Sequence, residues 1–447
     1  MKFGGTSLGN AERIKHVAGL IERNNNSVVV CSAIGGVTNT LVEMAAMWEN
    51  SGSREAEKLA ESLRNLFLQT CRDLFGESGL PESLAGSVNL HFDEIKNRLG
   101  QDYDLNGENW LLARGELITS EIIAFYLNST GIEITWLNAL EFIHTGEDNE
   151  PSVGDIRSRL GIIAGEDQPG RYLTQGYICR DHEGNTGNLK RGGSDYTATL
   201  LGAALNADTI EIWTDIDGVR NNDPRFVENT FPIRELSFDE AAELAYFGAK
   251  ILHPSCVWPA SANNIPIHLK NTMEPDAPGT VISTGKNRKG ITAVAAKEGI
   301  TVIRIRSDRM LNAYGFLSRI FSIFEKYKTP IDVITTSEIA VSLTIDNSRY
   351  IRDIETELAG CSTVTVEPGQ AIICIVGDVI EQHQDRAVKI LDSVKHFDVK
   401  MISYGGSRNN ITIVVPDEQR KDILRSLNNF LFDNQFKTTA PWLISQS

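Results

Sequence analysis

Two glycine pairs in the sequence have neighbours that could bind an anion. The first lies in KFGGTS (residues 2–7) and the second in RGGSD (residues 191–195), each with a basic side chain before the glycines and a hydroxyl after them. Each leads into a segment with helical spacing of apolar residues, where backbone N–H groups and the helix N-terminus can converge on one anion. Two anion-binding sites of this kind are what the transfer of a group between two small anions would require.

Both stretches also have a purely structural interpretation. The first glycine pair could form a tight turn, Lys2 could be a surface lysine, and Asp195 could serve only as the N-cap of a helix. A G-x-x-x-x-G-K-[ST] stretch does not occur in the sequence, which excludes the P-loop NTPases on motif. Any phosphate site at these glycines must therefore be of another kind.

Other polar residues stand where predicted strands or turns end. Thr214 and Asp215 follow a predicted strand, and the carboxyl end of a parallel strand is the usual place for a ligand in an α/β sheet. An acidic surface turn would explain the same two residues. Thr38 follows a third glycine-rich turn, and Glu116 stands at the start of a helix. Lys250, near the end of another helix, could reach a phosphate or only complement the helix dipole.

The composition favours a globular protein with neither a nucleic-acid nor a membrane partner. The 447 residues suffice for about two to four domains, and 59 Asp and Glu against 43 Lys and Arg give a formal net charge of -16, which would repel a polyphosphate backbone. No run approaches the roughly 18 apolar residues of a membrane helix. The six cysteines are scattered without C-x-x-C pairs, so neither a zinc site nor a disulfide framework is indicated. We expect a cytoplasmic protein.

The hydrophobic pattern predicts an α/β domain followed by a region of another kind. Strands and helices alternate up to about residue 282, which favours a mostly parallel sheet with helices on both faces, and residues 39–99 form a helical excursion from it. The basic, glycine-containing stretch 283–294 is interpreted as the boundary. We place the first domain in residues 1–285 and the second region in residues 291–447.

The second region contains two copies of one β-α-β-β pattern. A shift of about 68 residues places Ile331 on Val399 and Leu343 on Ile411 without a gap. A tandem repeat of a small α+β module is the simplest explanation. The modules would cover about residues 298–365 and 366–440.

A series of ordered motifs resembles those of the aspartokinases, members of the amino acid kinase family. The motifs are KFGGTS, RGGSDYTA, WTDIDGV with NDPR, FGAKILHP and TTSE, and they span nearly the whole chain. The resemblance implies a three-layer αβα catalytic domain of the carbamate kinase-like fold and two C-terminal α+β (ferredoxin-like) ACT domains, which can interlock. It also implies transfer of a phosphoryl group from ATP to the side-chain carboxylate of L-aspartate.

The resemblance assigns roles to the residues that carry chemistry. The catalytic residues would be Lys2, Asp195 and Lys250. The substrate aspartate would be bound by Thr38, Glu116, Arg191 and Ser194, with the arginine at a carboxylate and the glutamate at the ammonium. ATP, with Mg2+ bridging its phosphates, would be bound by Lys2, Gly4, Gly5, Thr6, Ser7, Thr214, Asp215, Arg220, Arg225 and Lys250. Arg220 stands where the family more often has Tyr or Met, and its guanidinium could stack on the nucleotide instead.

The resemblance also implies regulation. ACT modules are amino acid sensors that pair through their sheets, so a homodimer or larger homo-oligomer is expected. L-lysine is the expected inhibitor, with threonine as the alternative, because TTSE and its surroundings resemble the monofunctional lysine-sensitive members. Asp332 would contact the ammonium of lysine, or would be a solvated charge at the start of a strand. The positions that match the effector pocket are Met310, Gly315, Phe316, Leu317, Asp332 and Ser337.

Two other functions fit part of the sequence. One is an amino acid kinase acting on glutamate or acetylglutamate, although such relatives generally lack paired ACT modules and the RGGSDYTA string. The other is a non-catalytic amino acid sensor, because only Met1 precedes Lys2 where the family usually has most of a strand. Formation of aspartyl phosphate distinguishes these functions from the first.

Overall fold

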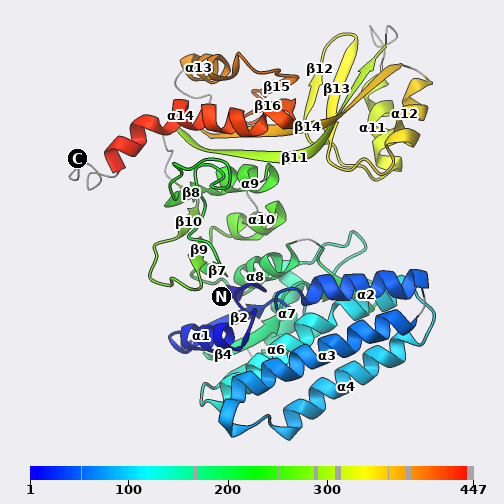
Figure 1. The fold of residues 1–447 in the computed structure, drawn as a ribbon, viewed down its shortest axis with the longest axis vertical. Helices are drawn as coiled ribbons and strands as arrows, with labels where there is room; N and C mark the ends of the chain where they lie inside the picture. The colour runs from blue at the N-terminus through cyan, green and yellow to red at the C-terminus, as the bar shows by residue number, and fades with distance from the viewer. Residues whose placement is uncertain are drawn as a thin grey trace. The chain divides into compact units, whose positions relative to one another are not determined.

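The computed structural model (Figure 1) divides the chain into two compact units. The first unit holds Met1–Val219, Arg234–Phe238 and Leu252–Thr284, and the second holds Arg220–Ile233, Asp239–Ile251 and Gly285–Ser447. Two segments from within the expected first domain, residues 220–233 and 239–251, therefore pack with the C-terminal region. The structure describes residues 1–51, 53–164, 169–190, 192–248, 252–285, 290–307, 314–360, 362–378 and 384–439.

The first unit is built on an eight-stranded sheet with the order β3-β4-β2-β1-β7-β9-β10-β8. Neighbouring strands are parallel except β9 and β10, which are antiparallel. This confirms the predicted mostly parallel sheet. In sheet order, the strands are β3 (Thr135–Leu137), β4 (Arg171–Gln175), β2 (Ser27–Cys31), β1 (Lys2–Phe3), β7 (Ile210–Thr214), β9 (Ile267–Asn271), β10 (Thr280–Ser283) and β8 (Glu235–Ser237); β5 (Ile178–Arg180) and β6 (Thr186–Asn188) form a separate hairpin.

Helices cover both faces of this sheet. The apolar sides of α1 and α6 share one buried core with β1 and β2, whereas α8 packs on β1, β2 and β7 and is flanked by α7 and α10. The arrangement confirms the predicted three-layer αβα fold. The helices are α1 (Ala11–Glu22), α5 (Leu105–Leu112), α6 (Arg114–Ser129), α7 (Val153–Ala164), α8 (Gly193–Ala204) and α10 (Pro254–Ala262).

The predicted helical excursion consists of three helices, α2 (Val37–Ser51), α3 (Ser53–Phe75) and α4 (Glu82–Leu99). Figure 1 shows them as long helices lying side by side. They add apolar side chains such as Phe67 and Phe92, whose ring centroids are 6.0 Å apart, to the core under the sheet. The excursion therefore covers the outer side of the layer formed by α1 and α6.

The second unit contains two interlocked α+β modules that share two long strands, β11 (Ile291–Arg306) and β14 (Thr363–Gly377). Its six-stranded sheet has the order β12-β13-β11-β14-β16-β15, and all neighbours are antiparallel. The second half of β11 pairs with β13 and with the first half of β14, while the second half of β14 pairs with β16 and with the first half of β11. The first module is thus inserted into the second, and the simple tandem arrangement is wrong.

The internal repeat is real, but its gapless alignment is wrong by two residues. The N–H of Asp332 donates to the oxygen of Thr344 in the first hairpin, and the N–H of Lys400 donates to that of Val414 in the second. The loop between the two strands spans residues 337–339 in the first copy and residues 405–409 in the second. The remaining elements of the two modules are α11 (Phe316–Lys326), β12 (Ile334–Thr336), β13 (Ala340–Ile345), α12 (Ile351–Ala359), α13 (Gln384–Val394), β15 (Met401–Tyr404), β16 (Asn410–Pro416) and α14 (Arg420–Thr439).

Specific polar contacts explain why segments 220–233 and 239–251 belong to the second unit. The side-chain amides of Asn221 and Asn222 donate to Oδ1 of Asn428 at 3.2 and 3.3 Å. In α9 (Phe238–Tyr246), Glu243 accepts a 2.6 Å hydrogen bond from the amide of Asn410. The C-terminal partners, Asn410 and Asn428, belong to no sequence motif, so the expected boundary near residue 285 did not anticipate these contacts.

Two further properties concern the described parts of the chain. No helix there is long and apolar enough to cross a membrane. The cysteines described are free and buried: Cys31, Cys71, Cys179, Cys256 and Cys374.

Candidate active site

The first glycine loop and the second glycine motif meet through Lys2 and Asp195. Lys2 lies in the central strand β1, opposite Val30 of β2 and Ile212 of β7. Its Nζ atom is 2.7 Å from Oδ1 of Asp195 in the first turn of α8, and both side chains are largely buried. A Cβ atom added to Gly4 would lie 3.4 Å from the same Nζ, so the ammonium stands beside the glycine loop. The first glycine loop and the start of α8 therefore meet at this ion pair.

Gly5 permits two loops to touch. A Cβ atom added there would lie 2.8 Å from the carbonyl oxygen of Ala33 and 3.3 Å from Cα of Gly35. The carbonyl of Gly5 accepts hydrogen bonds from the N–H groups of Leu8 and Gly35 at 3.3 and 3.0 Å. The first glycine loop is therefore fixed against the third glycine-rich turn, which leads into α2 and half-buried Thr38.

The hydroxyl of Ser7 has hydrogen-bond partners within the protein. Its side chain is buried, and its Oγ lies 2.7 Å from Oγ1 of Thr272 and donates to the carbonyl of Trp213 at 3.4 Å. These contacts fasten the glycine loop to the ends of β7 and β9. Thr6 is exposed, and its carbonyl accepts a hydrogen bond from Arg13. The expected contact of the Ser7 hydroxyl with ATP has no support from this geometry.

The second glycine motif is shaped by close contacts on both sides of α8. Gly192 has a φ of 77°, and a Cβ atom added to it would lie 2.3 Å from Cβ of His253. Ser194 packs so closely on Gly176 that an added Cβ atom there would lie 2.5 Å from Cβ of Ser194. The N–H of Gly176 donates to the carbonyl of Cys31 at 2.9 Å, which places Ser194 beside the ends of β2 and β4. Arg191 and Lys250 lie outside the described residues.

Glu116 is a buried carboxyl group in the first turn of α6. It is 3% exposed, and its Oε1 accepts a 3.4 Å hydrogen bond from the N–H of Ala33. Its Oε2 is buried without a hydrogen-bond partner among the described residues. Burial raises the pKa of Glu116 to about 8. The group is therefore largely neutral near pH 7 and suited to hold an ammonium, which would restore its charge.

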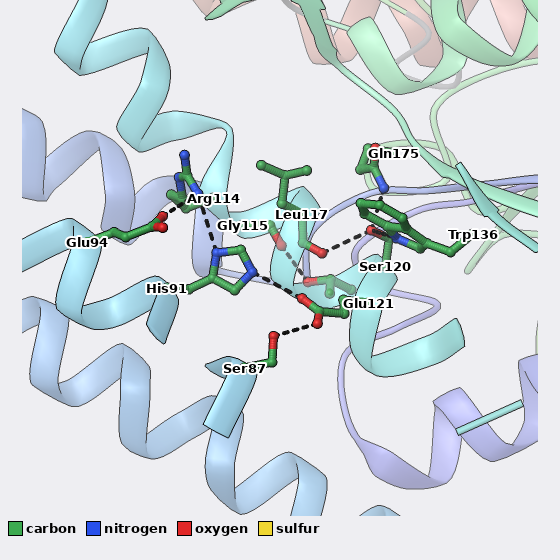
Figure 2. Close-up of polar contacts among 11 residues, drawn as sticks. Ser87, His91, Glu94, Arg114, Gly115, Leu117, Ser120, Glu121, Trp136 and Gln175 are labelled. Atoms are coloured by element: carbon green, nitrogen blue, oxygen red, sulfur yellow. Dashed lines mark hydrogen bonds and ion pairs between the residues drawn. The ribbon is translucent and has the colours of Figure 1, made fainter. Parts of the chain in front are cut away.

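Polar contacts to α4 anchor the helix that carries Glu116 (Figure 2). Glu121 of α6 lies 3.0 Å from Nε2 of His91 and accepts a 2.5 Å hydrogen bond from Ser87. The hydrogen bond to His91 lowers the pKa of Glu121. Arg114, at the start of the helix, donates to Glu94 at 3.0 Å. Sequence reasoning missed this network because its members belong to no motif.

Contacts to the sheet anchor the other side of α6. Figure 2 shows Ser120 Oγ between two donors, the amide of Gln175 at 2.7 Å and the indole N–H of Trp136 at 3.0 Å. The preceding residue of the helix, Thr119, accepts a 3.2 Å hydrogen bond at its hydroxyl from the N–H of Ile34. The carboxyl of Glu116 is thereby held against the turn that precedes Thr38.

The end of β7 adjoins the first glycine loop. The N–H of Gly4 donates to the carbonyl of Trp213 at 3.4 Å, and the next residue, Thr214, is half-buried. Oγ1 of Thr214 donates to Asp215 at 3.2 Å and accepts from the N–H of Ile216 at 3.3 Å. Thr214 and Asp215 therefore lie at the carboxyl end of a parallel strand, next to the loop that carries Gly4.

Arg220 and Arg225, two further residues expected at the nucleotide, belong to the second unit and have partners there. Nε and Nη2 of Arg220 donate to Oγ1 and to the carbonyl of Thr230 at 2.8 and 2.7 Å. Arg225 is exposed and forms an ion pair with Asp223, with Nη2 and Oδ2 2.6 Å apart. Stacking of Arg220 on a nucleotide gains no support from these contacts, and the contact of Arg225 with ATP stays a prediction.

The expected effector positions that the structure describes all belong to the first module. Gly315, with a φ of 79°, precedes α11, where Phe316 is buried and Leu317 is partly exposed. Ser337 closes the turn between β12 and β13 through a 2.8 Å hydrogen bond from its N–H to the carbonyl of Ala340. The Asp332 side chain is 2% exposed, so it is not a solvated charge. Met310 lies outside the described residues.

Comparison with known proteins identifies the family of the chain. The model of the amino acid kinase family matches residues 1–271. The chain is 34% identical over 468 residues to aspartokinase 1, chloroplastic, of Arabidopsis thaliana, with 97% of this chain and 80% of the relative covered. The chain belongs to the aspartokinases. It is a phosphotransferase of the amino acid kinase family, with aspartate kinase activity under allosteric regulation.

A sequence and a crystal structure from Escherichia coli extend the comparison. Lysine-sensitive aspartokinase 3 of Escherichia coli K12 is 31% identical over 447 residues, with 97% of this chain and 98% of the relative covered. The crystal structure of E. coli aspartokinase III in complex with aspartate and ADP matches with a TM-score of 0.85 at 29% identity and covers 96% of this chain and 99% of that one. The match spans both units of this aspartokinase.

Proposed function

We propose that the chain transfers the γ-phosphoryl group of ATP to the side-chain carboxylate of L-aspartate, forming 4-phospho-L-aspartate and ADP, and that L-lysine inhibits it. The observation that carries the proposal is the 2.7 Å pairing of Lys2 with Asp195 where the two glycine motifs meet. A basic group, two loop-to-helix junctions and a buried acid then lie around one place in the first unit. The similar E. coli structure that holds aspartate and ADP supports the choice of substrates.

Lys2, Gly4 and Gly5 would bind the phosphates of ATP, with Lys250 contributing by resemblance. Among the described residues no group of three or more His, Cys, Asp or Glu side chains could hold a metal ion. Mg2+ fits nevertheless, because it usually binds through one or two carboxylates together with substrate phosphates and water. Asp195 supplies one carboxylate beside the glycine loop. When bound, Mg2+ would neutralise phosphate charge.

Thr38, Glu116 and Ser194 would bind aspartate, with Arg191 at a carboxylate by resemblance. Glu116 would take the α-ammonium, because a buried carboxyl group with an unpartnered oxygen gains most from a cation. The helix anchors drawn in Figure 2 keep that carboxyl in place before the substrate arrives. Preorganisation of this kind lowers the entropic part of the barrier.

Transfer needs neither a general base nor a covalent enzyme intermediate. The side-chain carboxylate of aspartate is already ionised at neutral pH and attacks as the nucleophile. The work of the protein is to align two anions and to neutralise charge on the transferring group, as in other phosphoryl transfers. Lys2 serves the second task, and Asp195 holds its ammonium in position.

Lysine would bind in the first module at the effector positions named above. The E. coli relative is named lysine-sensitive, and a structure of E. coli aspartokinase III is described in complex with lysine and aspartate. Self-association would accompany this role, supported by Leu317 and Phe321, which are partly exposed on α11 while its other face is buried.

The decisive experiment traps the product. Purified chain is incubated with Mg-ATP, L-aspartate and hydroxylamine, and the aspartyl hydroxamate is measured with and without L-lysine. Product that depends on aspartate, and not on glutamate or acetylglutamate, is expected. Binding of ATP and aspartate without product would show a non-catalytic sensor. If lysine does not change the amount of product, the chain is a kinase that lysine does not inhibit.

A further inference from the structure

The Asp332 carboxylate already has an ammonium partner inside the chain. Nζ of Lys297 lies 2.7 Å from Oδ1 of Asp332 and 2.8 Å from Oδ2 of Asp346. The hydroxyl of Tyr246 donates to Oδ1 of Asp332 at 2.8 Å, and the Lys297 ammonium also lies 4.8 Å from the centre of the Tyr246 ring. One cation thus joins two carboxylates and an aromatic ring.

The backbone fixes the members of this cluster. Lys297 lies at the irregularity in the pairing of β11 with β14, just before Gly299, whose φ is 77°. Asp332 is tied to β13 by a 2.9 Å hydrogen bond from its N–H to Thr344, and Asp346 directly follows β13. The Lys297 side chain therefore crosses from the shared strand to the first module.

The charges in the cluster reinforce one another. Burial by itself would lower the pKa of Lys297, but hydrogen bonds to Asp332 and Asp346 raise it above its usual value. Lys297 is 20% exposed and Asp332 is 2% exposed, so solvent screens their ion pair weakly. Oδ2 of Asp332 is buried and has no hydrogen-bond partner among the described residues.

We propose that Lys297 is a tethered competitor for the effector, occupying with its own ammonium the carboxylate that an effector ammonium must contact. The inference rests on the proposed function, in which Asp332 receives lysine. An incoming ammonium must displace Lys297 from Asp332 or share the carboxylate against its positive charge. Asp346 provides the place to which Lys297 can withdraw. Lys297 thereby sets the lysine concentration to which the enzyme responds.

Two substitutions shift lysine binding in opposite directions under this proposal. Lys297→Met frees Asp332 and is expected to lower the dissociation constant for L-lysine about tenfold, since removing a competing cation restores one charge-assisted contact. Asp346→Asn removes one of the two carboxylates described at Lys297, which leaves its ammonium on Asp332, and is expected to raise that constant severalfold. Lys297→Arg keeps the charge and should bind lysine no more tightly than the wild-type chain. Isothermal titration of the full-length chain with L-lysine measures all three.

Lys326→Met is the matched control. Lys326 forms an ion pair with Glu357 in the same module without touching Asp332, so its loss should leave lysine binding unchanged. Tighter binding by Lys297→Met alone supports the proposal, even if the wild-type chain binds lysine too weakly to measure. Unchanged, weaker or absent binding by Lys297→Met overturns it. The hydroxamate assay without lysine measures the proposed kinase activity separately. A failure of the proposed function can therefore be told from a failure of the proposal for Lys297.

Discussion

The ammonium of Lys2 and the carboxylate of Asp195 are 2.7 Å apart, although one belongs to the first strand and the other to α8. The pair ties together the two glycine motifs of the active site. Because this cation is already held in position, it needs little reorganisation when charge develops on the phosphoryl group during transfer.

Lys2→Met should reduce the rate of aspartyl hydroxamate formation about 100- to 1,000-fold, as expected for losing one preorganised positive group. The strand itself should survive, because β1 pairs through its backbone with both neighbours. Circular dichroism and thermal unfolding check the fold. Lys15→Met, on the exposed side of α1, is the control and should keep the wild-type rate. A Lys2→Met enzyme of near-normal rate would contradict the role given to Lys2.

Gly5→Ala should destabilise the chain by about 1 to 3 kcal/mol, because the new Cβ atom would lie 2.8 Å from the backbone oxygen of Ala33 and one of the two loops must shift. The same shift should raise KM for ATP. Gly19→Ala is the matched control, since nothing lies within 4 Å of its added Cβ atom and alanine favours the interior of α1. Its free energy of unfolding should rise by about 0.5 to 1 kcal/mol. Equal effects of the two substitutions would refute the steric argument.

Local sequence signals predicted the first unit well. The glycine pairs need close approach or left-handed backbone, and both requirements occur, at Gly5 and at Gly192. Alternating strands and helices predicted the parallel sheet because that periodicity is local. Glu116 was correctly placed at the start of a helix, and its burial gives the residue its chemistry.

Side-chain direction and long-range pairing could not be predicted in the same way. The sequence shows that Ser7 has a hydroxyl, but only the fold shows it turned toward Thr272. Arg220 contacts Thr230 because of the path that the loop between them takes. Lys297 contacts Asp332 because β11, which carries Lys297, is shared by the two modules. These partners are set by tertiary packing, for which the sequence carries no periodic signal.

Ser7→Ala should lower stability by about 1 kcal/mol through loss of the buried hydrogen bond to Thr272, with KM for ATP changed less than about threefold. A double-mutant cycle with Thr272→Val, followed by urea unfolding, measures the coupling between the two hydroxyls. A coupling energy near zero together with a large rise in KM for ATP would instead place the Ser7 hydroxyl at the nucleotide.

Glu116→Gln should change how stability depends on pH. The folded-state pKa of about 8 exceeds the usual 4.5, so between these values the folded chain holds a proton that the unfolded chain releases. The stability of the wild-type chain therefore falls as pH rises through this window, and glutamine removes that contribution. The Tm of Glu116→Gln relative to the wild-type chain should rise from pH 5 to pH 8. Glu12→Gln, at an exposed position in the first turn of α1, is the matched control for replacing a carboxyl group by an amide.

The same proton governs substrate binding. Suppose that Glu116 must be ionised to hold the ammonium of aspartate. The fraction of enzyme that can bind aspartate then rises up to tenfold per pH unit below pH 8, which is about the pKa of Glu116, and levels off above it. KM for aspartate in the wild-type enzyme should therefore fall as pH rises from 6.5 to 8, while KM for ATP stays nearly constant. In Glu116→Gln, KM for aspartate should be about 10- to 100-fold higher and independent of pH, because a charge-assisted hydrogen bond is lost. Hydroxamate kinetics at several pH values measure both constants. A wild-type KM for aspartate that does not change over this range would show that the Glu116 carboxyl does not receive the substrate ammonium.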